Sequence, residues 1–172
     1  MYREQAPDGQ QPAVRWLPFQ LNPDLPDTGI PRKEYMERTF GPGGHSCARV
    51  AGVGKEVGID FAFDSITVQP NTLHAHRLMI YASKQGCENE VAESLFRAYF
   101  QEGANLTDHA TLAAIGERAG LERVALEAFL ASGEDSNTVL RADLEARKAG
   151  VNGVPFFVFN GRTTVSGAHE PE

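Results

Sequence analysis

Apolar and polar residues alternate along the chain in distinct patterns, which divide it into an N-terminal strand, a helical middle and a C-terminal hairpin. Residues 14–21 (VRWLPFQL) mix β-branched, aromatic and aliphatic side chains. This composition predicts a buried strand whose far end is irregular, because Pro18 cannot donate to a ladder. Residues 22–30 (NPDLPDTGI) concentrate turn-forming residues and predict a connecting loop.

The middle of the chain carries apolar residues at helical spacing. Pro31 can open a first helix over residues 32–40, and a second helix is predicted over 46–57. Asn71 or Thr72 can cap the next helix, which Gly86 ends. Further helices, each followed by a glycine, are predicted over 90–102, 108–119, 121–131 and 136–149. The helices between residues 31 and 133 are therefore expected to form one packed helical subdomain.

The last part of the chain changes to a strand pattern. Residues 154–159 (VPFFVF) are almost continuously apolar, Asn160-Gly161 is favoured in two-residue turns, and residues 162–166 complete a β-hairpin. Pro155 lies at the start of the first strand, where its missing N–H removes no ladder bond. The order strand, helical insertion, helix and hairpin predicts an α/β fold with a mixed sheet.

Composition adds limits to this picture. With 172 residues, of which 41% are hydrophobic and 23% charged, the chain fits a single domain over residues 1–172. The net charge of −7 is spread along the sequence, which indicates a solvated surface and makes nucleic acid an unexpected partner. No apolar run approaches the ~18 residues of a membrane helix, and residues 1–12 show no signal-peptide core. We therefore expect a cytoplasmic protein without a membrane partner.

The residue types that carry redox or metal chemistry are sparse. Cys47 and Cys87 are forty residues apart, so they form no Cys-X-X-Cys motif. Free thiols are expected, and a redox pair between them is the alternative. His74 and His76 are two residues apart on a predicted helix, so they point about 200° apart and cannot chelate one metal ion. No metal site is predicted.

Residues 150–167 (GVNGVPFFVFNGRTTVSG) resemble the DsbA family, specifically its FrnE-like branch. The match extends to residues 15–23 (RWLPFQLNP), 71–78 (NTLHAHRL) and 95–100 (LFRAYF), and these blocks span about residues 14–166 in the family's order. The resemblance implies a thioredoxin-like mixed sheet with a large α-helical insertion. It also implies that Pro155 is a cis-proline that faces the reactive cysteine pair.

The resemblance also implies where a substrate would bind. Val154, next to Pro155, would offer its backbone N–H and C=O to an extended peptide or to glutathione by strand addition. Trp16 and Phe19 are candidates to line this groove, with core positions as the alternative. Asn71 matches a position that related 2-hydroxychromene-2-carboxylate isomerases use at a glutathione site, and a helix cap is its alternative role.

The sequence departs from the family pattern in one respect, because it contains no Cys-X-X-Cys. In the family this motif follows a first strand that lies in the centre of the sheet, between the strands at Val14 and Val154. The resemblance implies that this first strand and the last helix are missing from the chain. Each buried backbone group left unpaired would cost about 1 to 3 kcal/mol. A second copy that supplies the strand, in a homodimer, is therefore a further expectation.

Three functions follow from these observations. The first is a thiol-disulfide oxidoreductase that exchanges disulfides with a protein or a small thiol such as glutathione. The second is a glutathione-dependent isomerase on the same scaffold, and the third is a non-catalytic fragment or binding module. No bound cofactor is expected in any of the three, although glutathione would be a co-substrate of the first two.

Overall fold

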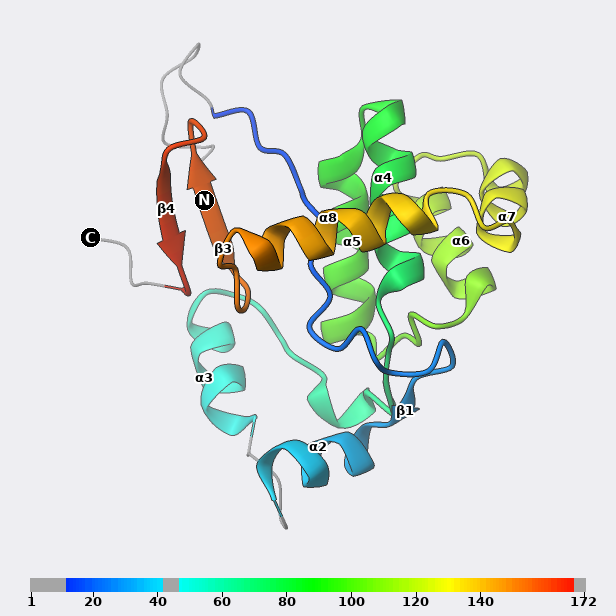
Figure 1. Ribbon diagram of the computed structural model, residues 1–172. Coiled ribbons are helices and arrows are strands. Elements are labelled where there is room, and N and C mark those ends of the chain that lie inside the picture. The colour runs from blue at the N-terminus through cyan, green and yellow to red at the C-terminus, as the bar shows by residue number, and fades with distance from the viewer. Residues whose placement is uncertain (1–11, 42–46, 169–172) are drawn as a thin grey trace.

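The structure is a computed structural model that describes residues 12–41 and 47–168 (Figure 1). Within these residues a body of helices carries two small antiparallel sheets. The helices are α2 (Arg32–Phe40), α3 (Ala48–Glu56), α4 (Leu73–Gln85), α5 (Glu88–Phe100), α6 (His109–Arg118), α7 (Arg123–Ala131) and α8 (Ser136–Lys148), together with the 3-10 turn η1 (Phe63–Ser65).

The helix boundaries agree with the sequence prediction to within a few residues, because the signals at the ends of the helices are local. The carboxylate of Asp108 accepts a hydrogen bond from the Thr111 N–H (2.9 Å) and caps α6. Glu122 caps α7 by accepting from two backbone N–H groups. Gly86 adopts φ 76° in the left-handed region and ends α4 as predicted.

The hydrophobic core lies inside the helical subdomain. Helices α4, α5, α6 and α7 pack against one another, and α8 packs on α4. The largest core side chains are almost completely shielded from solvent, and they are Leu78, Leu112, Ile115, Leu126 and Leu130. Every residue of this cluster falls between Ile66 and Leu130, so the helical subdomain supplies its own core.

Arg77 on α4 is a fully buried cation that ties α4 to the end of α7. Its guanidinium donates hydrogen bonds to the carbonyl oxygens of Phe129 (2.7 Å), Leu130 (3.2 Å), Ser132 (2.7 Å) and Glu134 (2.7 Å). These carbonyls belong to the last turn of α7 and to the loop after it, where no helical N–H is available. Arg77 thus donates hydrogen bonds to the carbonyl oxygens at the C-terminal end of α7, a helix that is distant in the sequence.

His74, one turn before Arg77, accepts a hydrogen bond from that guanidinium through Nδ1 (2.9 Å), so its ring is neutral there. The His109 ring lies edge-on at 4.4 Å. Burial, His109 and Arg77 lower the pKa of His74 below its ordinary value, and Asp27 opposes them. Protonation of His74 therefore works against the fold.

We expect the free energy of unfolding to decrease as the pH falls below about 6.5, the ordinary pKa of histidine. The unfolded chain takes up this proton near that pH, whereas folded His74 takes it up only at a lower pH, so the stability is complete above this window. Urea unfolding of the wild type and of His74→Asn at pH 7.5 and 5.5 tests this. Asparagine keeps an acceptor for Arg77 without titrating, so its loss of stability should be smaller. Equal losses in the two proteins would contradict the assignment.

The predicted strand over residues 14–21 is wrong, because this segment joins no ladder in the described part of the chain. Side chains of α4 and α8 hold its backbone instead. His76 Nε2 lies 3.1 Å from the Phe19 carbonyl oxygen, the Gln20 N–H donates to Asp143 Oδ1 (2.8 Å), and Arg147 donates to the Gln20 carbonyl. These bonds satisfy the Phe19 carbonyl and the N–H and carbonyl of Gln20, which a neighbouring strand could otherwise have paired.

Asp143 and Arg147 form the centre of this anchor. Burial by itself raises the pKa of Asp143, but hydrogen bonds from Arg147 and from the Gln20 N–H, together with the charges of Arg147 and His76, hold it below its ordinary value. The Arg147 guanidinium also lies 4.5 Å from the centre of the Phe19 ring. A charged pair therefore connects the N-terminal segment to α8.

Two short sheets complete the fold. Strand β1 (Ile30–Pro31) pairs with β2 (Val68–Gln69), a two-residue ladder that the sequence did not predict. Strand β3 (Phe156–Phe159) pairs with β4 (Thr163–Ser166), and this confirms the predicted hairpin. Asn160 (φ 51°) and Gly161 (φ 67°) both occupy the left-handed region, and the Arg162 N–H donates to the Phe159 carbonyl (3.0 Å). Because Phe159 pairs with Thr163, the loop comprises residues 160–162, one residue more than predicted.

Candidate functional site

Val154 and Pro155 lie directly before β3, at the end of the hairpin that is remote from its turn. The peptide bond between them is cis, the isomer that the family resemblance implies. The Pro155 carbonyl accepts a hydrogen bond from the Gly167 N–H (2.9 Å) and so closes the hairpin. The Val154 side chain is 49% exposed, and its backbone makes no hydrogen bond within the described residues. Val154 therefore has a free donor and a free acceptor in front of the strand.

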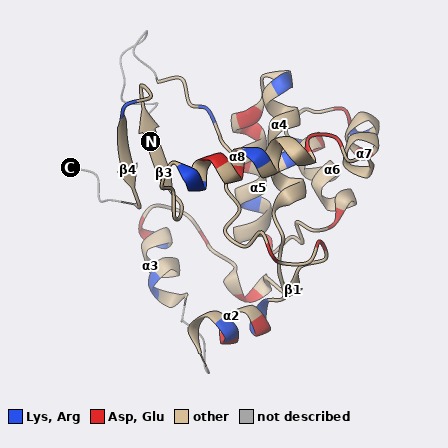
Figure 2. Ribbon diagram, in the orientation of Figure 1, with Lys and Arg blue, Asp and Glu red and all other residues tan. Residues whose placement is uncertain are grey.

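The hairpin stands apart from the helical body, beyond the C-terminal end of α8 (Figure 1). Its apolar side chains are open to solvent, with Phe157 at 48% and Val158 and Phe159 each at 54% exposure. Its strands carry no charged residue, whereas acidic and basic side chains are spread over the helices (Figure 2). Strand β3 pairs with β4 along one edge, and its other edge is unpaired in the part of the chain that the structure describes. An uncharged, unpaired edge of this kind can accept an added strand.

The two aromatic candidates, both on the N-terminal segment, contact different helices. Trp16 is 42% exposed, donates from Nε1 to Asn89 Oδ1 (3.0 Å), and packs with its ring centre 5.9 Å from that of Phe96 on α5. Phe19 is buried beneath Arg147 of α8, a core position. Trp16 and Phe19 thus both contact helices, Trp16 on α5 and Phe19 on α8. A role for either residue beside Val154 stays a prediction.

Asn71 is buried immediately before α4, and its side-chain amide is engaged at both ends. Its Oδ1 accepts from the Leu73 N–H (2.9 Å) in the first turn of α4, and its Nδ2 donates to the Leu25 carbonyl (2.7 Å). Asn71 therefore precedes the N-cap residue Thr72, satisfies the first N–H of α4 and fixes the loop before β1. Its contact with glutathione stays a prediction, and such a contact would compete with these two bonds.

The two cysteines occupy separate helix starts and are both free thiols. Cys87 directly precedes α5, and its thiol lies 3.7 Å from the Ala82 carbonyl oxygen. Burial and, to a smaller extent, the nearby Glu90 raise the pKa of Cys87, which keeps it protonated and unreactive at neutral pH. Cys47 directly precedes α3 and is partly exposed. The raised pKa of Cys87 is the opposite of what a redox nucleophile needs.

Among residues 12–41 and 47–168, no group of three or more His, Cys, Asp or Glu side chains could hold a metal ion. None of the helices in that part of the chain is both long and apolar enough to cross a membrane.

Comparisons with known proteins connect this geometry to a family. A family model described as a DSBA-like thioredoxin domain matches residues 2–172. The uncharacterized protein YwbO of Bacillus subtilis (strain 168) is 26% identical over 170 residues, which cover 96% of this chain and 80% of YwbO. The crystal structure of the probable DsbA oxidoreductase SCO1869 from Streptomyces coelicolor superposes with a TM-score of 0.75 at 23% identity, over 88% of this chain and 67% of that one.

These matches confirm the expected fold class, a thioredoxin-like, mixed α/β fold with a large helical insertion. The likeness to SCO1869 concerns the fold, and the family match extends over nearly the whole sequence. This chain belongs to the family of DsbA-like thioredoxin domains.

Proposed function

We propose that this protein is a FrnE-like thiol-disulfide oxidoreductase, in which Val154 and Pro155, directly before β3, bind an extended peptide or a small thiol such as glutathione. The observation that carries the proposal is the backbone of Val154, which makes no hydrogen bond within residues 12–41 and 47–168, beside an uncharged strand edge that is unpaired in the same residues. Membership of the DsbA-like family supports the reaction type.

The reaction needs a cysteine pair, which these 172 residues do not contain in Cys-X-X-Cys form. In the proposal the pair comes from polypeptide outside this sequence, placed along the free edge of β3. One thiolate attacks the substrate disulfide and forms a mixed disulfide, and the released substrate sulfur takes up a proton. The second thiol loses its proton and attacks the mixed disulfide, so the enzyme ends as a disulfide and the substrate as a dithiol. The reverse sequence oxidises a substrate dithiol.

The residues of this chain hold the substrate during that exchange. The Val154 N–H and C=O would pair with the backbone of an extended substrate, which places its sulfur next to Pro155. Backbone pairing is independent of the substrate sequence, so it suits an enzyme that accepts several proteins. The exposed Val154 side chain adds an apolar contact without a charge that would repel a thiolate.

The remaining expectations belong to the same proposal. A reducing compartment suits two free cysteines with no partner thiol, so the proposed location is the cytoplasm. The proposed partners are thiol or disulfide substrates, with no bound cofactor. A homodimer in which a second copy covers the β3 edge is an alternative way to complete the sheet. The isomerase alternative gains no specific support, because the Asn71 amide is already occupied by backbone partners.

Insulin reduction in the presence of dithiothreitol tests the proposal. The 172-residue chain is compared with a version extended at its N-terminus by a strand and by a helix that begins with Cys-Pro-X-Cys. We expect turnover in the extended protein and only the background rate in the shorter one. An extended protein that folds, as judged by circular dichroism, yet stays at background would contradict the oxidoreductase function.

A substitution in the extended protein tests the role of Val154 separately. Val154→Asp places a carboxylate beside the reacting sulfur and is expected to lower kcat/KM roughly tenfold, equivalent to about 1.4 kcal/mol in the transition state. Val154→Thr has nearly the same shape without the charge, and it should retain most of the activity. Equal activity of the two variants would remove Val154 from the proposed site.

A further inference from the structure

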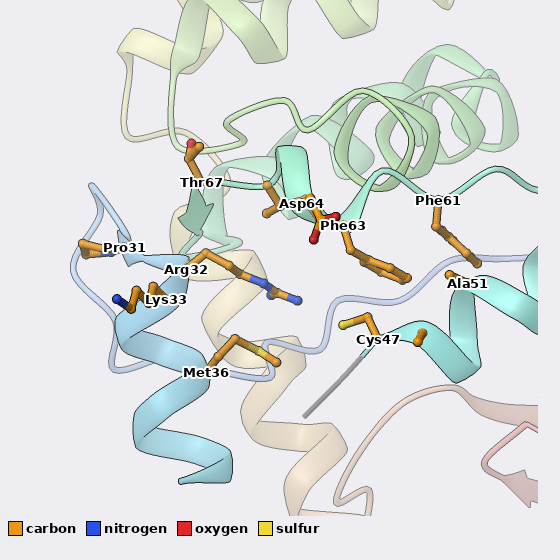
Figure 3. Close-up of a pocket in the computed structure, with 12 residues that line it drawn as sticks. Pro31, Arg32, Lys33, Met36, Cys47, Ala51, Phe61, Phe63, Asp64 and Thr67 are labelled. Atoms are coloured by element: carbon orange, nitrogen blue, oxygen red, sulfur yellow. The ribbon is translucent and has the colours of Figure 1, made fainter. Parts of the chain in front are cut away.

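A hollow lies away from the hairpin, between α2, α3 and the segment from η1 to β2. Its volume is about 700 Å³, within the ~300 to 1,000 Å³ typical of small-molecule sites. Figure 3 shows the Arg32 guanidinium, the Phe63 ring and the sulfur atoms of Met36 and Cys47 around the same space. No residue of the hairpin lines it, so this hollow is separate from the proposed thiol-exchange site.

One wall of the hollow is aromatic. The rings of Phe61 and Phe63 stack with their centres 4.9 Å apart and their planes inclined by 21°. Phe100 of α5 supports both rings from behind in edge-on contacts at 6.0 and 6.3 Å. Phe61 and Phe63 are partly exposed, as expected for rings with one face towards the hollow. A flat ligand can pack against such a wall.

The backbone holds this wall in place. The Ala62 N–H donates to the Phe100 carbonyl (2.8 Å), which fixes the chain between the two rings. Ser65, at the end of η1, packs so closely on Gly103 that a Cβ atom added there would lie 2.5 Å from the Ser65 carbonyl oxygen. The aromatic wall is therefore formed before any ligand arrives, which reduces the entropic cost of binding.

The opposite side of the hollow carries a cation, Arg32, that pairs with no carboxylate of residues 12–41 and 47–168. Arg32 Nη1 donates to Gln69 Oε1 and, at 3.5 Å, to the Tyr99 hydroxyl, both uncharged partners. Within the described residues, no acidic side chain lies within 4.0 Å of Arg32, and Asp64 on the same rim is also beyond that distance. Arg32 Nη2 and Nε make no hydrogen bond in that part of the chain. The N–H groups on Nη2 and Nε, which lie in the plane of the guanidinium, are thus available to form two parallel hydrogen bonds with a carboxylate.

We propose that this hollow binds a small aromatic carboxylate, with its ring against Phe61 and Phe63 and its carboxylate on Nη2 and Nε of Arg32. The combination of a stacked apolar wall and a partly buried guanidinium selects for both properties of such a ligand. Cys47, also in the lining, reports on occupancy because a bound ligand covers its thiol.

Calorimetric titration with 2-naphthoate tests the proposal, with 2-naphthamide as the uncharged probe of the same shape. We expect 2-naphthoate to bind and 2-naphthamide to bind at least about tenfold more weakly, since it cannot form a charge-assisted pair. Arg32→Met should weaken 2-naphthoate binding by a similar factor. Arg38→Met on the same helix is the matched control, since Arg38 is exposed and pairs with Glu34, and it should leave binding unchanged.

Alkylation provides a second measurement that does not depend on the Arg32 variant being stable. Iodoacetamide labelling of the wild type, followed by peptide mass spectrometry, should be slower at Cys47 when 2-naphthoate is present and unchanged at Cys87. The proposal is overturned if 2-naphthoate does not bind at millimolar concentration, if both probes bind equally, or if Cys47 is not protected. These outcomes are independent of the insulin assay, which reports on the hairpin.

Discussion

Arg77→Met is expected to lower the free energy of unfolding by about 3 kcal/mol or more, because each buried carbonyl left without a donor costs about 1 to 3 kcal/mol. Methionine fills much of the volume of the arginine stem but donates no hydrogen bonds. The carbonyl oxygens of Leu130, Ser132 and Glu134 would lose this donor at once, and that of Phe129 would keep only its bonds from Ser132. The contact between the guanidinium and the Phe129 ring, 4.9 Å from its centre, would also be lost. Urea unfolding followed by circular dichroism measures the change.

Arg118→Met is the control for this substitution. Arg118 lies on the surface of α6, and its side chain is 50% exposed in its pair with Glu102. Exposed ion pairs of this kind contribute about 0 to 1 kcal/mol. If Arg77→Met cost no more than Arg118→Met, the four carbonyls would not depend on Arg77, and its place in the fold would need another explanation.

Gly103→Ala is expected to cost about 3 kcal/mol, because two separate penalties add there. The residue has φ 69°, and a left-handed backbone costs an alanine about 1 to 2 kcal/mol. The new Cβ would also lie 2.5 Å from the Ser65 carbonyl oxygen and 2.7 Å from the Ser65 Cβ, so the backbone would have to move. Overpacking of this kind typically costs about 1 to 3 kcal/mol.

Gly86→Ala separates the two penalties. Gly86 has φ 76°, close to the value at Gly103, but a Cβ there would meet no atom within 4 Å. It should therefore show the backbone cost alone, about 1 to 2 kcal/mol. Thermal and urea unfolding of the two variants side by side give the difference. Equal losses would mean that the approach of Gly103 to Ser65 is not tight in solution.

The sequence predicted the helices well because their signals are local. The glycine that ends α4 and the carboxylate that caps α6 lie within a few residues of the turns they control. The hairpin was equally predictable, because Asn160 and Gly161, which favour a turn, both lie in its loop. These elements needed no information about the rest of the fold.

The failures involve partners that are distant in the sequence. Residues 14–21 have the composition of a strand, but Asp143, which is 123 residues from Gln20, holds this segment. Local composition cannot distinguish a backbone paired with a strand from one paired with side chains. The same holds for Asn71, whose partner Leu25 lies 46 residues earlier. The candidate site was predicted at Val154 and Pro155, which are adjacent, and not at Arg32 and Phe63, which only the tertiary fold brings together.

The confinement of the core to residues between Ile66 and Leu130 has a consequence for biosynthesis. A ribosome makes the chain from its N-terminus, so every side chain of that cluster is synthesised before the hairpin. The helical subdomain can then condense by short-range contacts, which form quickly. The N-terminal segment has to wait, because Asp143 and Arg147 are made later. We therefore expect the helical insertion to fold first. The N-terminal segment then docks on it once α8 has been made, and the hairpin docks last.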